Sequence, residues 1–265
     1  MDSPHPLNVK RPRNLVQTIE RVDHLLGILG KAGQGLSLGE LAGAVGLPKG
    51  TTHRLLSSLV YFDYVQQDAV SRRYRLGFKL VTLGNCLLDQ IDLHKVAQPH
   101  LLRLAQRTKE TAHLVILDND QALYIDKIQL SSEGLHMASR LGFRAPLHCT
   151  AVGKVLLAHL PEAEVDRIIA RQGLSQHTVH TLTDGEGLKS HLGKVKADGY
   201  ALDNEEHSDG VRCVAAPVRD MAGGVVAAIS VSAPAVRVTL AVAENRVKPL
   251  VMETADNISQ ALGYT

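Results

Sequence analysis

Tryptophan is missing from this 265-residue chain, and aromatic residues make up only 3% of it. Proteins that bind single-stranded nucleic acid stack the bases on exposed aromatic rings, so that class of binding is not expected. No apolar run approaches the roughly 18 residues that cross a bilayer. The N-terminal stretch holds charges and prolines instead of a signal-peptide core. The composition therefore predicts a cytoplasmic globular protein with no membrane partner.

Cysteine is also scarce. The three cysteines, Cys86, Cys149 and Cys213, lie far apart and form no CxxC pair. This spacing argues against a disulfide framework and against a structural zinc ribbon. Three buried, reduced thiols are the expectation.

The net charge of +2 hides an uneven distribution of charge along the chain. Residues 1–80 contain 11 Lys and Arg against 6 Asp and Glu, whereas residues 81–265 contain 18 against 21. The length allows one large domain or two small ones, and this split favours a basic module joined to a mildly acidic one. A basic module can bind the phosphates of duplex DNA.

The N-terminal segment shows two patterns in succession. Residues 1–13 carry three prolines together with Lys10, Arg11 and Arg13 and lack apolar periodicity, which predicts a disordered basic arm. Over 15–29 apolar residues then recur at steps of three and four, which predicts a first helix that Gly30 or Gly33 can end.

Two short helices are predicted next. Ser37 and Glu40 fit a capping box at the start of one helix, Gly46 can end it, and Pro48 suits the start of the next. The polar, basic outer face of that next helix is formed by Lys49, Thr51, Thr52, His53, Arg54 and Ser57. Segments 64–66 and 73–76 then read as a β-hairpin, so the whole matches a winged helix-turn-helix.

Specific DNA contacts can be assigned within this motif. Side chains early in the second helix reach major-groove base edges, and Arg54 can pair with a guanine. The side chains expected to contact phosphates are Lys49, Ser57, Arg72 and Arg73, and Arg11 and Arg13 can enter the minor groove. Two other interpretations remain open: a helical pair with a solvated basic face, or a module that docks another protein.

The rest of the chain predicts an α+β domain with a mainly antiparallel sheet, because consecutive hairpin strands are flanked by helices. Apolar residues at helical spacing over 78–93 indicate a linking helix whose apolar stripe can serve dimer contact. Strands are predicted at 112–117, 122–128, 134–140, 213–219 and 225–232. Helices are predicted at 94–109, 151–160, 162–172, before Gly199 and at 240–262.

Two stretches of this domain could carry chemistry. At 147–157, small residues and a glycine lie at a predicted helix start, where free backbone amides and the helix dipole can hold an anion. Along strand 225–232, Ser230 and Ser232 must point to the same face. Their hydroxyls can therefore bond a ligand, unless that face is simply exposed.

The acidic stretch 199–213 leaves several interpretations open. It holds Asp203, Glu205, Glu206, His207 and Asp209, which could be metal ligands with His148, an acid–base set, or a solvated loop. A nucleophilic pair of Cys213 with His207 or His148 is a further alternative, against packing of a buried cysteine. No cofactor and no metal are assigned.

Taken together, these segments resemble the IclR family of bacterial transcription regulators over about residues 14–262. The resemblance rests on LPKGTTHRLLSSL at 47–59, YRLG at 74–77, PLHCTAVGKVLLA at 146–158, GYALDNEEHSDGVRCVAAPV at 199–218 and AAISVSAP at 227–234. Within the family, LHMASRLGFRAPLHCTAVGK at 135–154 and SQALGY at 259–264 are most similar to the 2-keto-3-deoxygluconate and sugar-acid regulators.

The resemblance implies an arm at 1–13, a winged helix-turn-helix at 14–77, a linking helix at 78–93 and a GAF-like effector-binding and oligomerisation domain at 94–265. It also implies a repressor that binds operator DNA as a homodimer or tetramer. The implied contacts to a small carboxylate effector are made by Ala151, Val152, Asp203, Cys213, Ser230 and Ser232. Leu135, Met137 and Leu141 can wall that pocket. A Cys/His or metal-assisted hydrolase built from Cys213, His207 and Glu205, with an N-terminal docking module, is the alternative.

Overall fold

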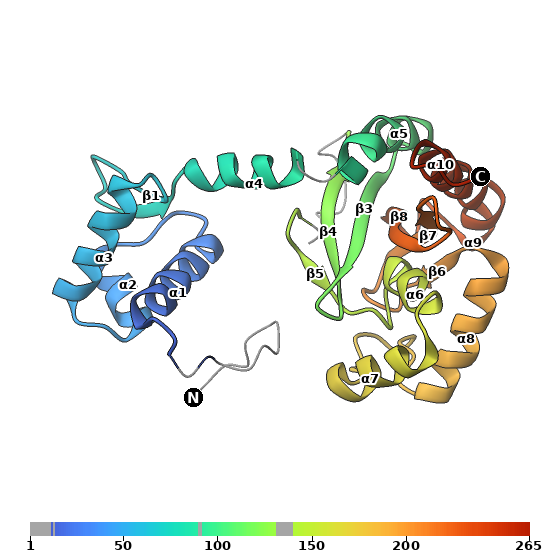
Figure 1. Cartoon of the computed structure of the whole chain (residues 1–265), viewed down its shortest axis with the longest axis horizontal. Helices are drawn as coiled ribbons and strands as arrows, with labels where there is room; N and C mark the ends of the chain where they lie inside the picture. The colour runs from blue at the N-terminus through green and yellow to red at the C-terminus, as the bar shows by residue number, and fades with distance from the viewer. Residues whose placement is uncertain (1–11, 13, 90–91, 131–139) are drawn as a thin grey trace. The chain divides into compact units, whose positions relative to one another are not determined.

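The computed structural model describes residues 12, 14–89, 92–130 and 140–265, and the chain divides into two compact units at residues 90 and 91 (Figure 1). The predicted arm at 1–13, with Arg11 and Arg13, therefore lies outside the described residues except for Pro12 and is not placed. Within the described residues, no helix is long and apolar enough to cross a membrane.

The N-terminal unit contains the predicted helices and wing. Its elements are α1 (Gln17–Lys31), α2 (Leu38–Val45), α3 (Lys49–Tyr61), β1 (Val65–Gln67), β2 (Tyr74–Leu76) and α4 (Lys79–Asp89). Apolar side chains from α1, α2, α3 and both strands form one core, which includes Leu25, Leu41, Leu56, Val65 and Tyr74. The helix-turn-helix and wing are thus one packed unit.

Local signals fix the ends of α2. The Ser37 hydroxyl accepts a hydrogen bond from the Glu40 amide at 3.3 Å, and Glu40 accepts one from the Ser37 amide at 2.7 Å, which confirms the capping box. Gly46 ends α2 in the left-handed conformation, with φ of 68°. Glycine adopts this conformation without a steric penalty, so it permits the tight turn into α3.

The C-terminal unit is built on a six-stranded antiparallel sheet. Its strands are β3 (Thr111–Asp118), β4 (Gln121–Ile128), β5 (Arg144–Ala145), β6 (Ala201–Asn204), β7 (Val211–Arg219) and β8 (Val225–Pro234), in the order β5-β4-β3-β8-β7-β6. Its helices are α5 (Asp92–Thr108), α6 (Ala151–Ala158), α7 (Glu162–Gln172), α8 (Gly185–Asp198), α9 (Leu240–Val242), the π-helical turn η1 (Ala243–Val247) and α10 (Lys248–Ala261).

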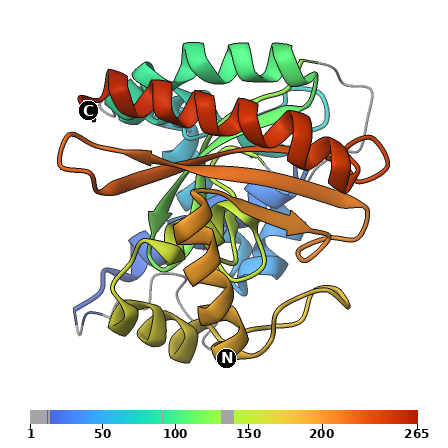
Figure 2. The ribbon, with the colours of Figure 1, turned by 90° about the vertical axis from the view of Figure 1, so that its right-hand side faces the viewer.

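Helices cover both faces of this sheet (Figure 2). α5 and α10 pack against each other and against one face, whereas α6 packs on the other face together with α8. The core on the α6 side includes all of α6 except Gly153 and Lys154, with Val165 and Ile168 of α7 and Leu188 of α8. The start of α6 therefore lies against the middle of the sheet.

Three parts of the chain differ from the expected elements or are described only in part. The acidic stretch begins with a strand, β6, which pairs with β7. Burial alternates along it: Ala201 and Asp203 are buried, whereas Leu202 and Asn204 are half-buried. Of the predicted strand 134–140 only Arg140 is described, and it lies outside any strand. Of the predicted linking helix at 78–93, the structure describes α4 up to Asp89 and α5 from Asp92, and residues 90 and 91 lie outside the described residues.

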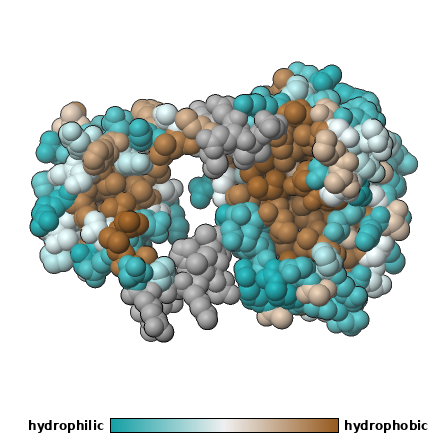
Figure 3. Space-filling model, in the orientation of Figure 1, coloured by the Kyte–Doolittle hydropathy of each residue, from teal (hydrophilic) through white to brown (hydrophobic). Residues whose placement is uncertain are grey.

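Apolar side chains also reach the surface of the protein (Figure 3). In the N-terminal unit, Val16, Ile19, Phe78, Val81 and Leu83 are exposed at the start of α1 and along α4. Such side chains are a recurring feature of protein–protein contact surfaces.

Candidate ligand pocket and nucleic-acid interface

Cross-strand pairing gathers the predicted polar residues on one face of the sheet. In register, Asp203 on β6 pairs with Cys213 on β7, which pairs with Ser232 on β8. Ser230 lies two residues earlier on β8 and so faces the same side, and it pairs with His113 on β3. Residues that lie far apart in sequence thereby form one polar patch under the start of α6.

A cavity of about 80 Å³ opens above this patch. Six predicted residues line it: Ala151, Val152, Asp203, Cys213, Ser230 and Ser232. The remaining lining residues are His113, Tyr124, Phe143, Thr150, His207, Ser208 and Val211. The structure thus brings the predicted polar set and the helix-start residues to the same cavity.

The first turn of α6 leaves two backbone donors at this cavity. Thr150 caps the helix: its hydroxyl accepts from the Gly153 amide at 3.1 Å, and its carbonyl accepts from the Lys154 amide at 2.9 Å. The amides of Ala151 and Val152 precede these bonds and have no acceptor within the helix. Amides at a helix start, supported by the helix dipole, suit a carboxylate.

Gly153 makes this arrangement sterically feasible. A Cβ atom at position 153 would lie 2.3 Å from the carbonyl oxygen and 2.4 Å from the Cα atom of Leu147. Both are backbone atoms, so a larger residue would push the start of α6 away from the preceding segment. The glycine in the sequence motif is therefore explained by close backbone approach.

Asp203 is only 2% exposed and is held by the backbone that follows it. Its Oδ1 accepts hydrogen bonds from the amides of Glu206 at 2.8 Å and His207 at 3.4 Å. Burial raises the pKa of this carboxyl to about 7, although the Glu206 amide lowers it in part. The neighbouring amides therefore orient the Asp203 carboxyl.

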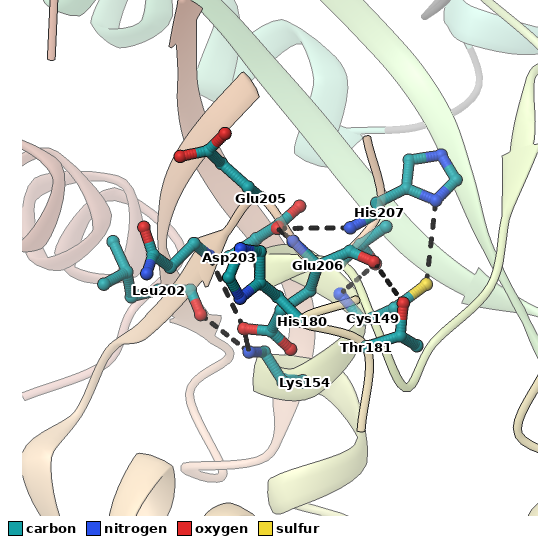
Figure 4. Close-up of polar contacts among 12 residues, drawn as sticks. Cys149, Lys154, His180, Thr181, Leu202, Asp203, Glu205, Glu206 and His207 are labelled. Atoms are coloured by element: carbon teal, nitrogen blue, oxygen red, sulfur yellow. Dashed lines mark hydrogen bonds and ion pairs between the residues drawn. The ribbon is translucent and has the colours of Figure 1, made fainter. Parts of the chain in front are cut away.

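Lys154 connects α6 to β6, which carries Asp203, and to the loop that follows β6 (Figure 4). Its side chain is fully buried, and its Nζ donates to the Leu202 carbonyl at 2.6 Å and to Glu206 Oε1 at 2.5 Å. A buried charge must be paired, so each member of this ion pair depends on the other. The pair fixes the loop against the helix start and places a positive charge close to the cavity.

The sequence missed the aromatic side of the cavity. His113, Tyr124 and Phe143 line it, and the rings of His113 and Tyr124 meet edge to face with centroids 5.1 Å apart. Burial lowers the pKa of His113 to about 3, so the ring is neutral. The two-residue period of β3 could have placed His113 on the same face as the apolar Val115. The sequence could not have predicted that His113 pairs with Ser230.

The predicted apolar wall is not confirmed. Leu135 and Met137 lie outside the described residues. Leu141 was predicted in the wall, but its side chain is 55% exposed and is not among the residues that line the cavity. It directly precedes a turn at Gly142, which has φ of 77°, and the chain enters the pocket only at Phe143.

The thiols differ from their expected placement. Cys149 is buried and Cys213 is partly buried, but Cys86 on α4 is exposed, so the prediction of three buried thiols is wrong. The thiol beside His207 is Cys149, with 3.6 Å between Sγ and Nδ1. Burial raises the pKa of Cys213, which opposes a nucleophilic thiolate.

The acidic stretch is largely satisfied by groups of the protein itself. Glu206 pairs with Lys154, and Glu205 accepts from the Arg212 guanidinium at 3.2 Å and from the Gly210 amide at 2.8 Å. These carboxylates do not converge with His148 in a common metal site among the described residues.

The candidate nucleic-acid interface is the exposed face of α3. Lys49, His53, Arg54 and Ser57 are exposed and Thr51 is half-buried. Thr52 was predicted on this face, but it is fully buried and its hydroxyl donates to the Pro48 carbonyl at 3.2 Å. Its position on the inner side of the first turn removes it from the set of expected DNA contacts.

The wing presents a second basic surface. Arg72 is exposed at the turn between β1 and β2, where it has φ of 57°. Arg73 donates to the Gly35 carbonyl at 2.9 Å and to Glu40 at 3.2 Å, so it ties the wing to the start of α2. Arg75, which the sequence reading did not single out, is exposed on β2.

Fold and site together define a class of protein. A winged helix-turn-helix with a basic exposed helix face occupies one unit, and an α+β domain on a six-stranded antiparallel sheet, with an anion-suited cavity, forms the other. This combination is that of a DNA-binding regulator with a sensory domain.

Comparison with known proteins identifies the family. The model of the bacterial transcriptional regulator IclR C-terminal domain matches residues 86–260, and that of the IclR helix-turn-helix domain matches residues 18–69. The HTH-type transcriptional regulator XynR of Escherichia coli K12 is 38% identical over 94% of this chain and 98% of its own length. The regulator KdgR of Dickeya chrysanthemi is 39% identical over 93% and 81%, and the repressor AllR of Salmonella typhi is 36% identical over 93% and 90%.

Comparison with solved structures identifies the same family. The crystal structure of the Thermotoga maritima IclR has a TM-score of 0.83 with 32% identity and covers 94% of this chain and 99% of its own. An IclR homologue from Microbacterium hydrocarbonoxydans, complexed with 4-hydroxybenzoate, has a TM-score of 0.81 with 25% identity over 92% and 98%. The chain belongs to the IclR family of ligand-responsive, DNA-binding transcriptional regulators, a non-enzymatic family. The hydrolase alternative is therefore wrong.

Proposed function

We propose that this protein represses carbohydrate or sugar-acid catabolic genes and that a small carboxylate, bound in the cavity, modulates its affinity for the operator. The observation that carries the proposal is the meeting of the Ala151 and Val152 amides with the polar patch of the sheet in one cavity. The relative AllR, which is itself a transcriptional repressor, supports the repressor role.

The chemistry of the cavity assigns a role to each group. The effector carboxylate accepts from the amides at the start of α6. Ser230, Ser232 and Cys213 offer short polar contacts to keto and hydroxyl oxygens of the ligand. Asp203, when protonated, donates a hydrogen bond to the ligand and so avoids repelling the carboxylate.

A second effector class has support in the same cavity. The rings of His113, Tyr124 and Phe143 form an apolar aromatic wall, which suits the ring of an aromatic carboxylate. The Microbacterium homologue complexed with 4-hydroxybenzoate makes this class a direct competitor to sugar acids. Both classes share the carboxylate that the helix amides would hold.

Operator binding requires two DNA-binding units. We infer a homodimer, which a pair of dimers can extend to a tetramer, because half-sites in operator DNA mirror two-fold symmetry. The exposed apolar side chains Phe78, Val81 and Leu83 on and before α4 provide a surface for the dimer contact. Sedimentation velocity of the wild-type protein beside Val81→Asp tests this: a shift of the variant to monomer is expected, and an unchanged species contradicts the assignment.

The test of the function is DNA binding to the intergenic region upstream of the protein's own gene at two salt concentrations. Tight binding that weakens with salt and is released by 2-keto-3-deoxygluconate is expected. Release by 4-hydroxybenzoate instead would favour the aromatic class. Binding that ignores both ligands would overturn the effector assignment, and no binding at either salt concentration would show that this region holds no operator for the protein.

A further inference from the structure

A cluster of nitrogen and sulfur donors lies outside the assigned ligand contacts. One ligand atom each from His148, Cys149 and His177 lies within 4.8 Å of the other two. His148 and Cys149 directly precede the cap of α6, whereas His177 belongs to the segment between α7 and α8. Two segments separated by the helices α6 and α7 thus bring three metal-binding side chains to one point.

Hydrogen bonds hold the His177 segment in place. The Thr178 hydroxyl donates to the Glu205 carbonyl at 2.7 Å, and the Thr181 hydroxyl donates to the Glu206 carbonyl at 2.7 Å (Figure 4 shows the latter). The Thr181 hydroxyl also accepts from the His177 amide at 3.0 Å. His177 is therefore fixed next to the buried pair although its own side chain is exposed.

The protonation states also suit a metal ion. His148 Nε2 lies 3.0 Å from the Ser175 carbonyl oxygen, which can only accept, so Nε2 carries the proton and Nδ1 keeps its lone pair. A histidine whose second nitrogen donates to a carbonyl is the usual arrangement around a metal. Burial lowers the pKa of His148, which keeps the ring neutral.

Cys149 Sγ also lies 3.6 Å from His207 Nδ1, so a third histidine adjoins the cluster. Metal ions bind cysteine as the thiolate, so metal binding at Cys149 must displace the thiol proton.

We propose that His148, Cys149 and His177 bind a divalent metal ion of the zinc class. Two imidazole nitrogens and one thiolate are a donor set that favours Zn²⁺ over Mg²⁺ or Ca²⁺, and three protein ligands leave a fourth position open. Because Cys149 lies two residues before Ala151, the ion would sit beside the start of α6. Metal binding is measured on the free protein, without effector and without DNA.

Cobalt titration of the metal-stripped full-length protein tests the site, because Co²⁺ bound to a thiolate gives a charge-transfer absorption band. One equivalent of Co²⁺ should produce this band, Zn²⁺ should displace it, and about one proton should be released per ion. Cys149→Ser should abolish the band.

His177→Ala gives the second test, because this side chain is exposed and its loss should leave the fold intact. It should weaken Co²⁺ and Zn²⁺ binding at least tenfold, whereas His180→Ala, which changes an exposed histidine three residues further on, should not. Far-ultraviolet circular dichroism checks that the variants fold. The proposal is overturned if the wild-type protein shows no thiolate band, or if His177→Ala and His180→Ala bind the metal equally well.

Discussion

Asp203 shows how one buried carboxyl can make ligand binding depend on pH. No cation contacts it directly among the described residues; it accepts hydrogen bonds from the amides of Glu206 and His207. The nearby Lys154 already pairs with Glu206, and the Cys213 thiol and the His207 ring stay neutral near pH 7. Asp203 is thus the group that titrates in the cavity, with a pKa of about 7.

This predicts that an anionic effector binds best below pH 7. Above that pH the folded protein carries an ionised Asp203 facing the carboxylate, and the protonated fraction falls about tenfold per unit of pH. The Kd measured by isothermal titration should therefore rise by up to tenfold per unit from pH 7 to 9. Asp203→Asn keeps the shape and an acceptor for both amides, so its Kd should be flat. A flat profile for the wild-type protein would show that Asp203 does not face the bound carboxylate.

At the residue scale, the sequence predicted polar residues that line the cavity but not the aromatic residues around them. Ser230 and Ser232 were placed on one face by the two-residue period of a strand. His113 and Tyr124 were missed, because their approach to the cavity depends on which strands pair, and sequence pattern does not determine strand order. The burial of Thr52 could not be read either, since the register of α3 against α1 and α2 decides which of two adjacent threonines turns inward.

At the scale of elements, we expect different residues of α3 to read bases and to contact phosphates. Arg54 lies in the second turn of the exposed face, and Lys49 lies at the first helical residue. Arg54→Ala should reduce discrimination against a mutated operator by about 1–3 kcal/mol. Lys49→Ala should weaken all DNA alike and reduce the slope of affinity against salt by about one. Fluorescence anisotropy with operator and scrambled duplexes measures both.

Arg73 was predicted from the sequence to contact phosphate, but Arg73→Ala is not a clean test of that contact. Its ties to Gly35 and Glu40 mean that the substitution also loosens the wing. Equal losses of discrimination for Arg54→Ala and Lys49→Ala would contradict the assigned division of α3.

Elements with strong local signals were predictable, and those fixed by tertiary contacts were not. The capping box of Ser37 and Glu40 and the Gly46 terminus mark α2 without any other part of the protein. β6 has only four residues, and three of the positions from 203 to 206 are acidic. The alternation of apolar and polar residues that marks a strand is therefore not visible in the sequence. It is a strand because β7 offers it a partner.

At the scale of the whole molecule, regulation is a matter of linkage. A ligand changes operator affinity only if it binds the DNA-competent and the released states with different affinity. Linkage then requires reciprocity: if saturating effector weakens operator binding by a given factor, saturating operator must weaken effector binding by the same factor. Titration of effector into free protein and into the preformed complex measures this. Unequal factors would show that effector acts at more than one site or changes the oligomeric state.

The placement of the three thiols has a practical consequence for labelling. Thiol reagents attack the thiolate, and burial disfavours that form at Cys149 and raises the pKa of Cys213 as well. Cys86 is exposed on α4, in the unit that carries the DNA-binding face. A fluorophore or spin label can therefore be attached to the native chain at one chosen point, without removing any cysteine, and report on the spacing of the DNA-binding units in the proposed homodimer.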